Sequence, residues 1–145
     1  MRNNRRTPGR LGPDTPVRIV ATEAGYRHGA MPRALLVTDS TWVVNDVSAA
    51  LSLGEWEIDQ LDDPQDAVAR VEETSPDAVI VDMQVTSMGG MAVIRDIRSH
   101  IEEDSRPRTV LLLDRQADRF LAGRAGADAS VIKPFEAVEL RSALA

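Results

Sequence analysis

Residues 77–90, DAVIVDMQVTSMGG, decide the fold of this chain. An apolar run rich in β-branched residues, 78–81, is too short for a helix and stops at Asp82, after which a loop closes on Gly89 and Gly90. A strand that is apolar on both faces is typical of the centre of a parallel sheet. In open α/β sheets, ligands and chemistry gather beyond the carboxyl ends of the parallel strands. The segment therefore predicts a central strand that presents the Asp82 carboxylate at a functional edge.

Segments with strand and helix patterns alternate on both sides of this central strand. The helical segments carry apolar residues three and four positions apart, and one of them begins at Asp63-Pro64, which predicts an N-cap followed by proline at the first helical position. Five strands that alternate with five helices predict an α/β fold, a doubly wound parallel sheet with right-handed crossovers. The predicted strands are residues 34–38, 55–61, 78–82, 109–113 and 129–132, and the predicted helices are residues 41–53, 64–74, 90–100, 117–124 and 135–145.

The length and composition exclude several classes of protein. The 145 residues are enough for one domain with a substantial core. The chain has no cysteine, which excludes disulfides and Cys-ligated metals and fits a reducing cytoplasm. No apolar run approaches the roughly 20 residues of a membrane span. We therefore expect a cytoplasmic protein with no membrane span.

The net charge of -6 is unevenly distributed along the chain. Residues 1–32 contain six arginines against two acids, a net charge of +4, and are rich in proline and glycine, which predicts a disordered basic tail. The remaining residues carry a net charge of -10, and an acidic body argues against nucleic acid as its main partner. We expect a folded domain over residues 33–145 and no DNA-binding domain.

Four of the predicted strands end at a charged side chain. Asp39 and Asp114 follow the first and fourth strands, Asp82 ends the third, and Lys133 follows the fifth. If the strand order is 2-1-3-4-5, Asp39 and Asp82 face the crevice at the topological switch point, while Asp114 and Lys133 close its other side. Carboxylates gathered at one edge suit a hard divalent cation such as Mg²⁺. The Lys133 ammonium is a natural countercharge for a phosphoryl oxygen.

Lys133 is also exceptional in composition, because it is the only lysine among 17 basic residues. The other basic residues are arginines, so arginine serves wherever a positive charge only has to be solvated. An ammonium is a compact point charge on a flexible stem, which a planar guanidinium does not replace. This contrast favours a specific role for Lys133 over a chance substitution.

The segments LLVTDS, VIVDMQVTSMGG, TVLLLD and AGADASVIKPF, in this order and at these spacings, resemble the receiver domain of two-component response regulators over about residues 33–145. The resemblance implies a flavodoxin-like (βα)5 fold with the strand order 2-1-3-4-5. It also implies that Asp82 accepts a phosphoryl group from a histidine kinase or phosphotransfer protein with the help of Mg²⁺. In this pattern the metal ligands are Asp39, Asp82 and the backbone carbonyl of Gln84, and Lys133 contacts the phosphoryl group.

Several positions depart from the family pattern. Thr38 replaces the first of two adjacent acids, and Asp114 replaces a hydroxyl residue at the end of the fourth strand. Ionised Asp114 donates no hydrogen bond to an acyl phosphate and repels it by about 1 to 4 kcal/mol per charge pair at close range. Two arrangements of Asp114 remain open, an ion pair with Lys133 that holds one conformation without phosphate, or neutralisation by Arg115. The other departures are Val85-Thr86 for Met-Pro, Gly89 for Asp, Arg115 for a small residue and Ser130 for an aromatic residue.

These observations support two main hypotheses for the function. The first is an atypical stand-alone response regulator that is phosphorylated on Asp82 and signals through contacts with an unidentified downstream protein, as a monomer or homodimer. It would not be an enzyme beyond self-phosphorylation and self-dephosphorylation. The alternative is a pseudo-receiver that binds proteins without phosphorylation. A flavodoxin-type or nucleotide-binding protein has less support, because Gly89-Gly90 match neither common phosphate-loop spacing.

Overall fold

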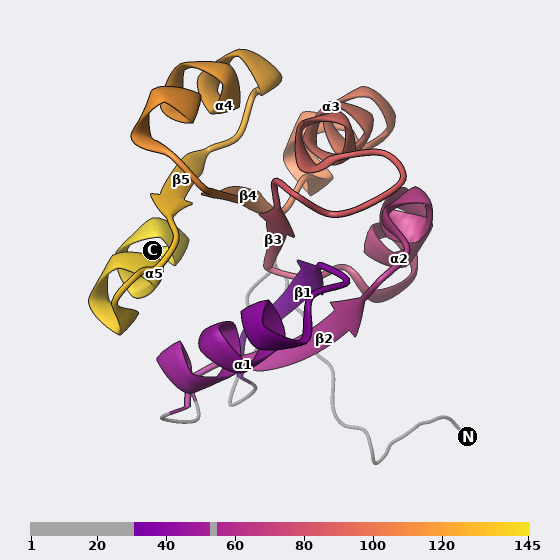
Figure 1. Cartoon of the computed structure of the whole chain (residues 1–145). Coiled ribbons are helices and arrows are strands. Elements are labelled where there is room, and N and C mark those ends of the chain that lie inside the picture. The colour runs from indigo at the N-terminus through magenta and orange to yellow at the C-terminus, as the bar shows by residue number, and fades with distance from the viewer. Residues whose placement is uncertain (1–30, 53–54) are drawn as a thin grey trace, which may run out of the picture. The chain divides into compact units, whose positions relative to one another are not determined.

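Five parallel strands form a single sheet in the computed structural model, which describes residues 31–52 and 55–145. The strand order is β2-β1-β3-β4-β5, and every neighbouring pair is parallel (Figure 1). This arrangement confirms the predicted flavodoxin-like (βα)5 fold. The strands are β1 (Arg33–Val37), β2 (Glu57–Leu61), β3 (Ala78–Asp82), β4 (Arg108–Leu113) and β5 (Ala129–Ile132).

Helices cover both faces of the sheet, as the alternating pattern predicts. Helices α1 and α5 pack on one face, and α2, α3 and α4 pack on the other (Figure 1). The helices are α1 (Thr41–Ala50), α2 (Ala67–Thr74), α3 (Gly90–His100), α4 (Arg119–Ala125) and α5 (Ala137–Leu144), with short 3₁₀ turns η1 (Pro64–Asp66), η2 (Glu103–Ser105) and η3 (Gln116–Asp118).

The core consists of two apolar clusters that the sheet separates. Successive residues of a strand point to opposite faces, so Leu35 and Val37 belong to the cluster under α2, α3 and α4, while Ala34 and Leu36 belong to the cluster under α1 and α5. Every residue of β3 is buried, which agrees with its position in the middle of the sheet. Each buried aliphatic side chain contributes about 1.5 to 3 kcal/mol by leaving water.

Several predicted element bounds were wrong by a few residues. The helix predicted for 41–53 ends at Ala50, and residues 53–54 lie outside the described part. The strand predicted for 55–61 begins at Glu57. The helices predicted for 64–74 and 117–124 each begin with a 3₁₀ turn, and the last helix covers only Ala137–Leu144. Apolar spacing identifies the buried face of a helix, but not the residue at which hydrogen bonding changes from 3₁₀ to α.

Residues Arg33–Ala145 form a compact unit of their own. The predicted disordered tail of residues 1–32 falls, apart from Met31 and Pro32, outside the described residues. Within the described ranges, no helix combines the length and the apolar character that a membrane crossing requires.

Candidate functional site

The Asp82 carboxylate lies at the carboxyl end of the central strand. Its side chain is only 3% exposed, because β1 and β4 flank β3 on its two sides. Oδ2 accepts a hydrogen bond from the Thr38 hydroxyl at 2.9 Å. Oδ1 accepts hydrogen bonds from the Gln84 backbone N–H at 3.1 Å and from the Lys133 ammonium at 2.8 Å. A buried charge requires such partners, and these donors compensate for the water that the carboxylate loses.

Lys133 brings the positive charge to this carboxylate from the end of β5. Its backbone N–H donates to the Leu113 carbonyl at 2.7 Å, and the peptide bond between Lys133 and Pro134 is cis. The Lys133 side chain is 9% exposed, and its ammonium also lies 3.3 Å from Asp114 Oδ1. Asp82, Asp114 and Lys133 are therefore brought together at one edge of the sheet.

The sequence leaves two partners open for Asp114, Lys133 and Arg115, and in the structure Asp114 forms an ion pair with Lys133. Arg115 pairs with the buried Asp118 at 3.0 Å. The hydrogen bond and charge of Asp118 raise the pKa of Arg115 above its usual value. The charge of Asp114 also contributes to this rise, so Arg115 lies within electrostatic reach of Asp114. The ion pair of Asp114 is with the Lys133 ammonium, which it shares with Asp82.

Thr38 occupies a buried position between β2 and β3. Its backbone N–H donates to the Leu61 carbonyl at 3.0 Å, and its carbonyl accepts from the Gln60 side chain at 3.2 Å. Its hydroxyl accepts from the Ser40 N–H at 3.1 Å and donates to Asp82. The sequence marked Thr38 only as a missing acid. The structure shows that the hydroxyl fixes the orientation of the Asp82 carboxylate.

Asp39 is exposed, and its recorded side-chain partner is the hydroxyl of Thr86, which donates to Oδ2. This hydrogen bond is the main reason why the pKa of Asp39 lies below its usual value. Asp39 and Thr86 line a hollow of about 490 Å³ together with Asp62, Asp63, Pro64, Gln65 and Ser87. Sequence reasoning missed the role of Thr86, which was noted only for its departure from the family pattern.

The predicted metal ligands differ in how well they suit a divalent cation. Hard oxygen donors are present, as Mg²⁺ requires. In the structure, however, both oxygens of Asp82 are hydrogen-bonded and Asp39 is bonded to Thr86. Over residues 31–52 and 55–145, no three His, Asp or Glu side chains gather in a way that could hold a metal ion. As arranged, the residues do not fit the cation, and ligation by the Gln84 carbonyl stays a prediction.

Gly90 allows α3 to begin directly against the end of β3. A Cβ atom at this position would lie 2.6 Å from the Asp82 carbonyl oxygen and 2.8 Å from Met83 Cα. The preceding Gly89 adopts φ +81 as the N-cap of α3, a conformation that favours glycine. These two glycines therefore make the turn from the loop into α3.

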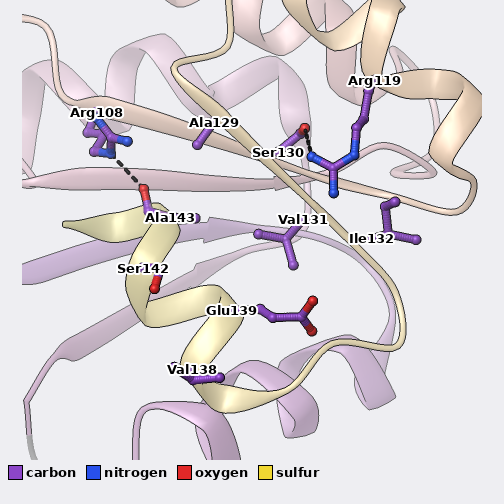
Figure 2. Close-up of a pocket in the computed structure, with 10 residues that line it drawn as sticks. All are labelled: Arg108, Arg119, Ala129, Ser130, Val131, Ile132, Val138, Glu139, Ser142 and Ala143. Atoms are coloured by element: carbon purple, nitrogen blue, oxygen red, sulfur yellow. Dashed lines mark hydrogen bonds between the residues drawn. The ribbon is translucent and has the colours of Figure 1, made fainter.

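A second hollow, of about 440 Å³, runs along the outer edge of β5. Figure 2 shows β5 residues together with Arg119 on one side and residues of α5 on the other. Arg119 Nη1 lies 3.5 Å from the Ser130 hydroxyl, to which it donates. Among the strands of the described residues, β5 pairs with β4 alone, so its other edge faces this hollow.

Comparison with protein families and curated sequences identifies relatives of this chain. The family model of the response regulator receiver domain matches residues 34–145. The transcriptional regulatory protein TrcR of Mycobacterium tuberculosis is 32% identical over 114 residues, which cover 77% of this chain and 43% of TrcR. The probable transcriptional regulatory protein TcrX of the same organism is 35% identical over 118 residues, which cover 79% of this chain and 49% of TcrX. The matched region spans less than half the length of either relative.

Solved structures show the same fold. The receiver domain of the sensor histidine kinase PA1611 from Pseudomonas aeruginosa, with a magnesium ion coordinated in its active site cleft, has a TM-score of 0.69 and 27% identity, and the match covers 79% of this chain and 95% of that chain. The chemotaxis response regulator CheY4 of Vibrio cholerae has a TM-score of 0.68 and 22% identity, with coverage of 79% and 97%. At that identity, the likeness to CheY4 supports the fold alone.

Proposed function

This chain belongs to the response regulator receiver domain family, and from that premise we propose that Asp82 accepts a phosphoryl group from a histidine kinase or phosphotransfer protein. Receiver domains act in two-component signalling, and phosphorylation on aspartate is general to the family. The observation that carries the proposal for this chain is the contact between the buried Asp82 carboxylate and the Lys133 ammonium at 2.8 Å.

Phosphoryl transfer to Asp82 requires little from the protein beyond positioning and charge. An oxygen of the Asp82 carboxylate attacks phosphorus, and the bond to the leaving group, a histidine nitrogen or acetate, breaks. Lys133 lies where it can neutralise the oxygens of the transferred group. The Thr38 hydroxyl holds the carboxylate in one orientation. No external substrate is turned over, so we propose a switch and not an enzyme.

Mg²⁺ binding is part of this proposal, under a condition that the hydrogen bonds of the site impose. Receiver domains generally bind it, and a similar structure contains it. As arranged, the side chains do not fit the ion, so for this chain we propose that Asp39, Asp82 and the Gln84 carbonyl bind Mg²⁺ only when Asp39 and Asp82 give up hydrogen bonds that they make in this structure.

A second candidate function is a pseudo-receiver that works without phosphate. The observation in its favour is the shared Lys133 ammonium, which Asp114 contacts at 3.3 Å. A phosphoryl group on Asp82 would have to compete with Asp114 for this charge, and it would meet a carboxylate where the family has a hydroxyl. In this version the resting conformation is already the one that a partner recognises.

In either version we propose that the output is a contact with another protein in the cytoplasm, made by a monomer or homodimer. The hollow beside β5 supports this proposal, since it offers a surface for a partner. Ser130 lines this hollow at the position where the family has an aromatic residue. Exposed apolar side chains lie nearby on α4 and α5, with Phe120 70% and Val138 59% exposed. Stand-alone action is likewise a proposal, since the relatives are longer proteins.

Incubation with acetyl phosphate and Mg²⁺, followed by intact-mass measurement, tests the phosphoacceptor proposal. We expect the mass of one phosphoryl group on the wild-type protein and none on Asp82→Asn, which preserves the shape of the side chain. Phos-tag electrophoresis provides an independent readout. Absence of the added mass from the wild-type protein, with a known receiver labelled in parallel, would favour the pseudo-receiver.

A further inference from the structure

Thr86 lies in the loop between β3 and α3, four residues after the phosphoacceptor candidate Asp82. Its side chain is exposed, yet its hydroxyl is not free, because it donates to Asp39 Oδ2 across the loop. Asp39 is one of the acids that a divalent cation would need at this edge of the sheet. A donor that occupies a carboxylate oxygen competes with a cation for the same lone pairs.

The loop holds Thr86 in a defined place. Val85 is buried in the core, and the Met88 N–H donates to the Thr86 carbonyl at 3.0 Å. Ser87 has φ +73, a conformation that few non-glycine residues adopt. The loop is also tied to the strand end, because the Gly90 N–H donates to the Met83 carbonyl at 3.2 Å. The Thr86 hydroxyl is therefore presented to Asp39 by a fixed backbone.

The neighbouring carboxylate is occupied in the same way. Thr38 donates to one oxygen of Asp82, and Gln84 and Lys133 donate to the other. Donors of the chain itself thus occupy three of the four carboxylate oxygens of Asp39 and Asp82. A cation at Asp39 and Asp82 competes with these donors, and competition with Thr86 for Asp39 Oδ2 weakens its binding.

We propose that Thr86 is a positioning residue that holds Asp39 away from metal ligation and so lowers the affinity of this site for divalent cations. The inference rests on the proposed function in one respect, namely that Asp39 and Asp82 are the cation ligands. Ligation of a cation by Asp39 Oδ2 then requires the Thr86 hydroxyl to release this oxygen.

Isothermal titration calorimetry of the full chain with Mg²⁺ alone tests the proposal. Thr86→Val keeps the shape of the side chain and removes the hydroxyl, and we expect it to bind Mg²⁺ about tenfold more tightly than the wild-type protein, which corresponds to about 1.4 kcal/mol. Thr86→Ser keeps the hydroxyl and should retain the wild-type affinity. Because Thr86 is exposed, both variants are expected to fold, which circular dichroism can check.

A second pair of variants is designed to bring the affinity for Mg²⁺ into the range that calorimetry measures. Thr38→Asp supplies a second carboxylate next to Asp39, and adding Thr86→Val to it should again tighten Mg²⁺ binding about tenfold. Adding Asp39→Asn to this double variant should remove the gain, because Thr86 acts through Asp39. Equal affinities with and without Thr86→Val overturn the proposal, as does a gain that survives Asp39→Asn or an absence of binding in every variant.

The calorimetric result is independent of phosphorylation. If Thr86→Val tightens Mg²⁺ binding while acetyl phosphate leaves Asp82 unlabelled, the role of Thr86 stands and the phosphoacceptor proposal fails. If Asp82 is labelled and Thr86→Val leaves the affinity unchanged, the phosphoacceptor proposal stands and the role of Thr86 is rejected.

Discussion

At the level of single residues, the Lys133 ammonium pairs with two carboxylates, those of Asp82 and Asp114. Replacing Lys133 by methionine removes the charge and keeps an unbranched apolar stem, so the buried Asp82 loses its closest ionic partner. Breaking a buried pair in this way costs about 3 to 5 kcal/mol. We expect the free energy of unfolding of Lys133→Met, measured with urea, to fall by about 3 kcal/mol. The double variant with Asp82→Asn should recover part of the loss, and an unchanged midpoint for Lys133→Met would show that the pair contributes little.

Asp114 should limit phosphorylation by its charge. Asp114→Thr removes a carboxylate that lies 3.3 Å from Lys133 and supplies the hydroxyl that is usual in the family. Repulsion of about 1 to 4 kcal/mol predicts at least a several-fold increase in the initial rate of labelling by acetyl phosphate. Asp114→Asn separates the two effects, because it removes the charge without adding a hydroxyl. Equal rates in all three proteins would mean that repulsion is not the limiting factor.

The hydrogen bond from Thr86 also predicts a pH dependence. It lowers the pKa of Asp39, so Thr86→Val should raise this pKa towards its usual value, while Thr86→Ser should not. Since the folded-state pKa is the lower one, the stabilisation is present above the unfolded-state pKa and is lost as the pH falls through the folded-state pKa. A carbon-13 NMR titration of the Asp39 carboxyl group measures the shift. An identical titration curve in Thr86→Val would contradict the contact.

The sequence predicted one half of the site better than the other. Asp82 ends β3, Asp114 and Lys133 directly follow β4 and β5, and parallel strands that end at one edge place these residues together. Asp39 also follows a strand, but its partner Thr86 depends on a loop with a positive φ at Ser87. Apolar periodicity carries no information on such backbone angles, so the Asp39–Thr86 contact could not be predicted from it.

At the level of elements, the junction between β3 and α3 depends on the lack of a side chain at residue 90. Gly90→Ala would place a Cβ atom 2.6 Å from the Asp82 carbonyl oxygen, and backbone atoms yield less readily than side chains. We expect a loss of about 1 to 3 kcal/mol in the free energy of unfolding, as for other overpacked sites, together with changes in the NMR signals of Asp82 and its neighbours.

A matched glycine-to-alanine substitution in α4 should raise the free energy of unfolding, where Gly90→Ala lowers it. A Cβ atom at Gly123 meets nothing within 4 Å, and this glycine lies inside the helix and is exposed. Gly123→Ala should therefore stabilise the protein by about 0.5 to 1 kcal/mol through helix propensity. Urea denaturation of the two variants side by side measures both changes, and a loss of stability in both would contradict the contrast.

Helix ends show the limit of prediction at this level. The buried faces of α2 and α3 follow from the spacing of residues such as Val71 and Ile97. The 3₁₀ turn before α2 does not, because the Asp63 side chain, which accepts from the Gln65 N–H at 3.0 Å, supports a first turn of either type. The Asp63 cap was therefore predictable from the sequence, whereas the helix type of the turn that follows it was not.

At the level of the whole molecule, the strand order was predictable once the alternation of strands and helices was joined to the family resemblance. Alternation alone predicts a parallel sheet, but several orders satisfy it. The sequence marks the centre of the sheet more clearly, since β3 is apolar up to Asp82, while β2 contains three polar residues and forms an edge of the sheet.

The unit Arg33–Ala145 should fold without the residues before it. Hydrogen bonds within the unit close the start of its first strand, where the Arg33 N–H donates to Asp77 Oδ2 and the Asp77 N–H donates to the Arg33 carbonyl, both at 2.8 Å. We therefore expect a chain of residues 31–145 to unfold cooperatively in urea, with a free energy within about 0.5 kcal/mol of the full chain, as for surface changes. A clearly lower midpoint would show that residues 1–30 stabilise the sheet and do not form an independent tail.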